Sequence, residues 1–122
     1  LPRKVWGRIQ VDWLRYPRIF DYGRASAWFV GEQEKDLRYI PSIFSGWDHT
    51  PRSGAEGIVL DHGTPEKFGV HVARVLDIVN KQDEHRILFL KSWNEWAEGN
   101  YMEPDLKYGN RFLETLKTAL ES

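Results

Sequence analysis

The sequence predicts an α/β protein in which parallel strands alternate with helices, and two observations carry this prediction. Short apolar runs at 41–47 and 87–90 are bounded by charged or turn-forming residues, as is typical of strands buried in a parallel sheet. A polar loop and then a helical pattern follow each run, and this order favours right-handed βαβ units. We therefore treat 1–122 as one α/β domain whose clearest βαβα pattern covers 41–122.

The first forty residues carry weaker patterns. Partial alternation of apolar and polar residues favours a strand at about 8–13. Pro17 suits the first position of a helix, and an imperfect apolar stripe predicts mostly helix over 19–36. Gly23 and Gly31 weaken that helix, each by about 1 kcal/mol relative to alanine.

From residue 41 the elements are better defined. The predicted elements are a strand at 41–47, an extended piece at 58–60, a helix from Thr64 to about Asn80, a strand at 86–93 and a helix at 109–121. Thr64 can cap the first of these helices, and Pro65 fits its first turn. Phe68, Val72 and Val75 then fall on one helical face, which is expected to be buried.

Composition indicates a globular domain and excludes several classes of protein. The 122 residues are 41% hydrophobic and 29% charged, which suits one domain or a piece of one. A net charge of −1 gives no general attraction to nucleic acid or to an anionic membrane. No apolar stretch is long enough to span a bilayer and no signal-peptide pattern opens the chain, so we expect a cytoplasmic location. With no cysteine and no histidines at ligand spacing, we expect neither a metal nor a cofactor.

The predicted chemistry lies in the segment 91–105, KSWNEWAEGNYMEPD, which follows the second apolar run. In α/β folds, ligands bind at the carboxyl ends of parallel strands. At such a strand end Glu95 and Glu98 can reach one pocket, and glycoside chemistry requires a pair of carboxyls. Nearby tryptophans would desolvate one acid and raise its pKa. From spacing alone, however, two solvated acids on a surface loop are the better interpretation.

Aromatic side chains supply candidate sugar platforms, since the chain is 14% aromatic with six tryptophans. The candidates near the two acids or on the first strand's loop are Trp47, Trp93, Trp96 and Tyr101. Core packing is the alternative for each of them. It is the interpretation that we favour for Trp93, and the balance is even for the others.

Polar candidates for substrate binding are Asn94, Asp48 and Arg52. Asn94 would bind a sugar hydroxyl or cap the strand end, while Asp48 would orient substrate or, as we favour, cap the following turn. Arg52 has a planar fork that suits a phosphate or an acidic sugar, but an intramolecular salt bridge is at least as good an interpretation. Glu103 and Asp105 would rim the site, although a solvated turn is the preferred interpretation for both.

Two motifs in a fixed order give the chain a resemblance to a known family. They are WDHTPR at 47–52 and WNEWAEG at 93–99, with EPD following at 103–105. The chain resembles the WbsX-like glycosyltransferases, which are related to glycoside hydrolase family 99, well over about 40–120 and only loosely over 1–40. His49 stands where the family usually has asparagine.

The resemblance implies a carbohydrate-active enzyme of bacterial surface polysaccharide or lipopolysaccharide biosynthesis. Its substrate would be an oligo- or polysaccharide. By the resemblance Glu95 is the base-like residue and Glu98 the proton donor, and this reverses the preference for two solvated acids. The alternative function is a noncatalytic glycan-binding or assembly module that retains part of the cleft.

The family fold that the resemblance implies is a (β/α) barrel of the TIM type. A complete eight-fold barrel needs about 250 residues, so we expect the carboxyl-terminal part of one, with about the last three strand–helix units. Leu1 in place of methionine suggests a processed or trimmed chain. Open sheet edges need a cover, so we expect either a homo-oligomer or an N-terminal segment that folds over them.

Overall fold

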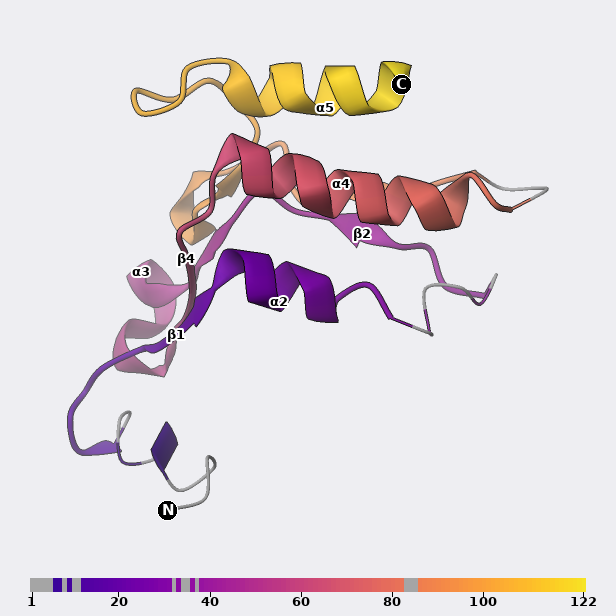
Figure 1. Ribbon diagram of the computed structural model, residues 1–122. Coiled ribbons are helices and arrows are strands. Elements are labelled where there is room, and N and C mark those ends of the chain that lie inside the picture. Colours follow the sequence, from indigo (N-terminus) through magenta and orange to yellow (C-terminus); the bar gives the residue numbers. More distant parts are fainter. Residues whose placement is uncertain are drawn as a thin grey trace.

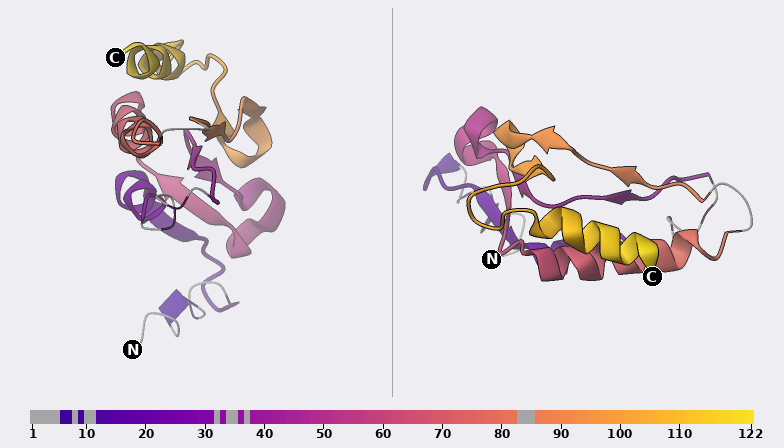
Figure 2. Two further views of the ribbon diagram at one scale, coloured as in Figure 1. Left: turned by 90° about the vertical axis from the view of Figure 1, so that its right-hand side faces the viewer. Right: turned by 90° about the horizontal axis from the view of Figure 1, so that it is seen from above.

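In the part of the chain that the structure describes, three longer helices lie side by side and cover one side of the strands (Figures 1 and 2). The computed structural model describes residues 6–7, 9, 12–31, 33, 36, 38–82 and 86–122. The helices are α2 (Tyr22–Trp28), α4 (Pro65–Val79) and α5 (Arg111–Glu121). The helix α4 is central and contacts both of the others.

The strands of the described residues form three small sheets. In the first, β1 (Arg18–Asp21) is parallel to β4 (Ile58–Asp61), and β3 (Trp47–Asp48) is antiparallel to β4. In the second, β2 (Ser42–Ile43) is parallel to β5 (Phe89–Leu90). In the third, β6 (Asn94–Glu95) is antiparallel to β7 (Asn100–Tyr101). The α/β class with parallel strands is confirmed, but these strands do not close into the expected barrel.

Short helical turns connect several of these strands. They are α3 (Thr50–Ser53), η2 (Gly54–Glu56) and η3 (Trp96–Glu98). The turn α3 begins the connection from β3 to β4, and η3 joins β6 to β7. Both therefore lie at strand ends, where the sequence placed the candidate site.

The strand expected at 8–13 is wrong where the structure describes that segment. Ile9 and Asp12 are helical, and the Trp13 backbone N–H donates to the Ile9 carbonyl at 3.1 Å. This local hydrogen bond replaces the sheet partner that an extended segment would need. The remaining positions of the expected strand lie outside the described residues.

The helix expected over 19–36 is shorter and begins later. Pro17 precedes β1 instead of a helix, and α2 starts only after Asp21. The Asp21 carboxylate accepts from the Arg24 backbone N–H at 3.0 Å, which is a side-chain cap. Pairing of β1 with β4 is a contact between distant segments, and a local apolar stripe carries no information about it.

The predicted elements of the second half agree better with the structure. The helix α4 begins after Thr64, whose hydroxyl accepts from the Lys67 backbone N–H at 3.3 Å. The extended piece at 58–60 is part of β4, and the last predicted helix is α5. The predicted strand at 41–47 is instead divided between β2 and β3, and only Phe89–Leu90 of the strand at 86–93 is paired.

The hydrophobic core lies where α4 packs on α5, β2 and the segment after β7. Its buried members are Ile43, Phe68, Val72, Val75, Val79, Met102 and Phe112. Burial of each large apolar side chain contributes about 1.5–3 kcal/mol. The helical face predicted from the sequence is therefore the face that builds the core.

The second apolar run is not buried on both faces, contrary to expectation. Ile87 is 46% exposed and Phe89 is 55% exposed. Among the described residues β5 pairs with β2 alone, so no second layer covers these side chains. Cover by a second copy or by another segment stays a prediction.

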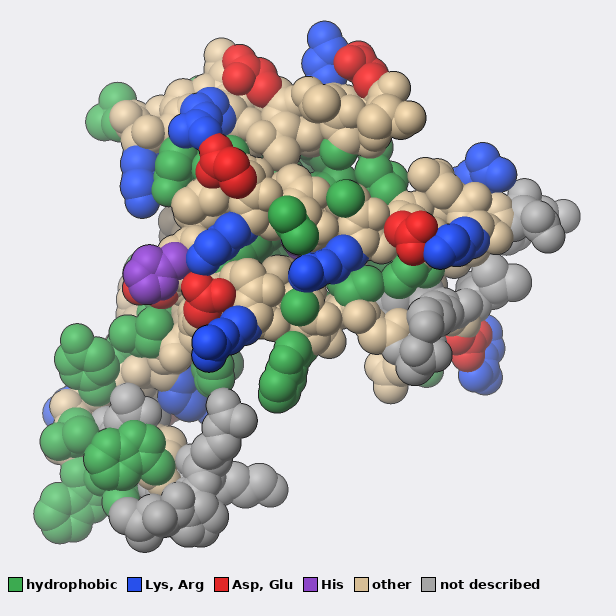
Figure 3. Space-filling model, viewed as in Figure 1, with side chains coloured by type: hydrophobic (Ala, Val, Ile, Leu, Met, Phe, Trp, Pro, Cys, Tyr) green, Lys and Arg blue, Asp and Glu red, His purple; other side chains and the backbone are tan. Residues whose placement is uncertain are grey.

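The surface carries mixed charges over the helices and apolar side chains near the beginning of the described chain (Figure 3). Trp13, Leu14 and Tyr16 are all strongly exposed there. Among the helices that the structure describes, none combines the length and the apolar character needed to cross a bilayer.

Candidate functional site

The two sequence motifs lie against each other, although forty residues separate them. The turn α3 and the strand β3 contact η3, and Figure 2 (right) shows the orange segment beside α3. Two glycines permit this approach. A Cβ on Gly46 would lie 2.8 Å from the Gly99 carbonyl oxygen, and one on Gly99 would lie 3.1 Å from the Asp48 Cβ. Gly99 also has a φ of +58°, which glycine adopts at little cost.

One guanidinium joins the two predicted acids. Arg52 Nη2 lies 3.2 Å from Glu95 Oε1, and Arg52 Nε lies 3.5 Å from Glu98 Oε1. The Glu98 side chain is 14% exposed and that of Glu95 is 35% exposed. The geometry thus brings Glu95, Glu98 and Arg52 together, and the salt-bridge alternative describes Arg52 in this structure.

His49 adds a second contact to Glu98 that the sequence did not indicate. His49 Nε2 lies 3.7 Å from Glu98 Oε1, and His49 Nδ1 lies 2.8 Å from the Ser53 hydroxyl. The spacing of four residues suits the contact of His49 with Ser53 across one helical turn, but it gives no signal for the contact with Glu98. The hydroxyl fixes the orientation of the imidazole ring beside the acid.

Trp96 and Tyr101 form a stacked pair. Their ring centroids lie 3.7 Å apart with an interplanar angle of 11°. The Trp96 indole N–H donates to Glu103 Oε2 at 2.6 Å, and the Tyr101 hydroxyl donates to Asp105 Oδ2 at 3.1 Å. Burial, with the hydrogen bond and charge of Asp105, raises the pKa of Tyr101, so the phenol stays a donor at neutral pH. Glu103 and Asp105 are therefore hydrogen-bonded to the aromatic pair, but both stay partly exposed and Asp105 begins a turn, as the solvated-turn interpretation expects.

The other aromatic candidates are separate from this pair. Lys91 Nζ lies 4.9 Å from the centroid of the Trp47 ring, at cation–π distance. Trp47 also lies beside His49, with ring centroids 6.2 Å apart. Trp93 is about half exposed, so core packing, the interpretation favoured from the sequence, is wrong for it.

Asp48 and Asn94 have local structural roles. The Asp48 carboxylate accepts from the Thr50 backbone N–H at 2.9 Å and from the Thr50 hydroxyl at 2.5 Å, as the capping interpretation requires. Asn94 is exposed and pairs with Tyr101 in the hairpin of β6 and β7. Sugar contacts by these two side chains stay predictions.

The family model described as Glycosyltransferase WbsX matches residues 4–116. The chain belongs to the WbsX glycosyltransferase family. This membership points to a carbohydrate-active role.

Two proteins of Xanthomonas campestris pv. campestris, both with the printed name Uncharacterized protein WxcX, are similar to this WbsX-family chain. The protein of strain B100 is 31% identical over 104 residues, which are 84% of this chain. The protein of strain ATCC 33913 is 34% identical over 88 residues, which are 70% of this chain. The matches cover only 15% and 13% of the length of these relatives. No solved structure matches the chain.

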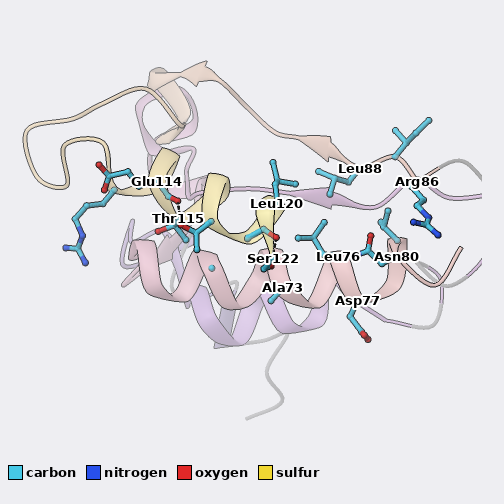
Figure 4. A pocket seen from close by; sticks show the side chains of 16 residues that line it. Ala73, Leu76, Asp77, Asn80, Arg86, Leu88, Glu114, Thr115, Leu120 and Ser122 are labelled. Atoms are coloured by element: carbon cyan, nitrogen blue, oxygen red, sulfur yellow. Dashed lines mark hydrogen bonds between the residues drawn. The ribbon is translucent and has the colours of Figure 1, made fainter.

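A hollow of this WbsX-family chain lies away from the two acids. It measures about 1090 Å³ and lies between α4, α5 and residues 86–88 (Figure 4). None of the predicted site residues lines it. We place the candidate site at the motif loops because the two predicted acids and Arg52 meet there, although polar side chains also line the hollow. Within the described ranges, no group of three His, Asp or Glu side chains is placed to hold a metal ion.

Proposed function

We propose that the chain is part of a bacterial enzyme that makes or breaks glycosidic bonds in surface polysaccharide or lipopolysaccharide, with Glu95 and Glu98 as its acid–base pair. The observation that carries the proposal is the contact of both carboxylates with the one guanidinium of Arg52. Family membership supports the carbohydrate class of substrate. An exposed tryptophan, Trp96, directly follows Glu95 in the chain.

Glycosidic chemistry requires two carboxyls with different tasks, one to donate a proton and one to act as base or nucleophile. Following the family resemblance, Glu95 takes the base-like task and Glu98 the proton donation. Arg52 lies within ion-pair distance of both acids, so its guanidinium would have to release Glu98 when that residue donates a proton. The Arg52 side chain is about half exposed, so it has room to swing toward solvent or toward an anionic group of the substrate.

Replacement of each acid by its amide tests the proposal. Glu95→Gln and Glu98→Gln keep the shape of the side chains but remove the proton chemistry, so each should lower turnover by about 100- to 10,000-fold. Glycan affinity should change little. The assays are glycosyl transfer from sugar nucleotides and hydrolysis of surface polysaccharide, with the full chain and with Glu121→Gln as a remote control. Unchanged turnover in both amide variants removes these acids from the mechanism.

A noncatalytic glycan-binding module is the second candidate. It is favoured by the small share of the relatives that the chain spans, 15% and 13%, because part of a cleft can lie outside this segment. Glycan binding followed by tryptophan fluorescence, with no turnover in the unmodified protein, would select this candidate over the enzyme.

A further inference from the structure

We propose that Glu103 and Asp105 are positioning residues that hold the Trp96–Tyr101 pair as a preformed platform for the C–H face of a pyranose ring. The inference rests on the proposed function only for the class of ligand, a glycan. It assigns a task to two acids that stand outside the acid–base pair.

The platform is built within the β6–β7 hairpin, with Trp96 in the turn η3 and Tyr101 in β7. Tyr101 covers one face of the Trp96 indole at 3.7 Å between centroids, while Trp96 remains 48% exposed. The free part of the indole therefore faces outward, in the residue that directly follows Glu95.

Each polar tip of the pair is fixed by one carboxylate. Glu103 accepts from the Trp96 indole N–H, so the indole cannot turn about its side-chain bonds without breaking a charge-assisted hydrogen bond. Asp105 accepts from the Tyr101 hydroxyl through Oδ2. Its Oδ1 accepts from the backbone N–H groups of Lys107 and Tyr108, at 2.8 and 2.5 Å, which ties the platform to the turn before α5.

These contacts select the mode of binding. Because the indole N–H is already donated to Glu103, Trp96 offers a sugar its π face and not a hydrogen bond. The carboxylate also pushes electron density into the ring, which strengthens attraction to partly positive C–H groups. A ring that is already fixed loses less conformational freedom on binding than a mobile one. The platform therefore fits a neutral pyranose with a face made mainly of C–H groups.

The test measures binding of methyl β-glucoside and methyl β-galactoside by tryptophan fluorescence and saturation-transfer NMR. Glu103→Ala and Asp105→Ala should raise Kd by about 3- to 10-fold, because the platform is no longer preformed. Glu103→Gln keeps an acceptor oxygen and should stay within about twofold of the unmodified chain. Trp96→Ala should abolish binding, and Glu121→Ala on α5 is the matched control. In turnover assays Glu103→Ala and Asp105→Ala should raise KM and leave kcat unchanged, whereas Glu121→Ala should change neither.

A second measurement does not depend on any variant folding. The Trp96 indole proton should exchange with solvent more slowly than that of the strongly exposed Trp13. Equal exchange of the two protons overturns the proposal. So does an unchanged Kd in Glu103→Ala, or the absence of binding of both glycosides up to about 100 mM.

These outcomes are separable from those that test the proposed function. Binding through Trp96 without any turnover keeps the platform and rejects the enzyme. If substitution of Glu95 or Glu98 lowers turnover but substitution of Glu103 changes neither KM nor kcat, the enzymatic proposal stands and the platform proposal is rejected.

Discussion

Gly99 is held in the left-handed region of φ, with Asp48 packed against it. Gly99→Ala should lower the free energy of unfolding by about 1–3 kcal/mol, because alanine is strained at φ +58° and its methyl group meets the Asp48 Cβ. Gly109→Ala is the matched control. Gly109 has a φ of +55°, but no heavy atom described lies within 4 Å of its Cβ position. Urea unfolding of both variants measures strain in the control and strain plus crowding in Gly99→Ala. Equal losses of the free energy of unfolding in the two variants would show that crowding against Asp48 does not add to the backbone strain.

At this scale the sequence predicted the neighbourhood of the acids but not their partners. Glu95 and Glu98 were expected together because both follow a strand end. The salt bridge of Arg52 stayed one of two interpretations, since its partners lie 43 and more residues away along the chain. The contact of His49 with Glu98 depends on the same packing of distant loops, so no local pattern contains it.

Gly69 sets the distance between α4 and α5. A Cβ at Gly69 would lie 3.0 Å from the Thr115 methyl group. In a helix interior, glycine to alanine gains about 1 kcal/mol from helix propensity, and this crowding opposes the gain. Gly69→Ala should therefore be more stabilising, by about 1 kcal/mol, in a Thr115→Ser background, which removes the methyl group. A double-mutant cycle in urea measures this coupling, and a coupling energy of zero would contradict the close contact.

Helices were predicted more reliably than strands for a physical reason. The signals that start α4, the cap of Thr64 and the ring of Pro65, are local and lie within one turn. The strands are two to four residues long and exist through partners far along the chain. The predicted strand at 41–47 is broken near Gly46 because that residue packs on the Gly99 carbonyl, a contact without a sequence signature.

For the whole molecule, His71 couples stability to pH. Its ring is fully buried against Phe44 and Tyr22, with centroids 4.7 and 6.4 Å apart, and neither ring nitrogen has a hydrogen-bond partner among the described residues. Burial, with the charge of Arg74, lowers the pKa of His71 to about 4, whereas an unfolded histidine has a pKa of about 6.5. Between these values the unfolded chain binds the extra proton.

Stability should therefore be complete above about pH 6.5 and fall as the pH is lowered toward 4, by up to about 3 kcal/mol. Free energies of unfolding at several pH values check this. His71→Leu should flatten the dependence in that window. The same slope in His71→Leu as in the unmodified chain would assign the dependence to other groups.

The α/β fold class was predictable from the sequence, but whether its strands close into a barrel was not. Apolar runs and amphipathic helices indicate parallel strands covered by helices, and the structure has them. Whether strands close into a barrel depends on neighbours for every edge, and the described residues leave Ile87 and Phe89 uncovered.

The closeness of Gly46 to the Gly99 carbonyl has a practical consequence for protein engineering. Since the two loops share one space, neither can be transplanted alone into a relative without meeting a foreign backbone. A chimera that moves residues 44–53 and 92–105 as one cassette should keep the Arg52 bridge. A chimera that exchanges only one of these two segments should lose the salt bridge of Arg52 with Glu95 and Glu98.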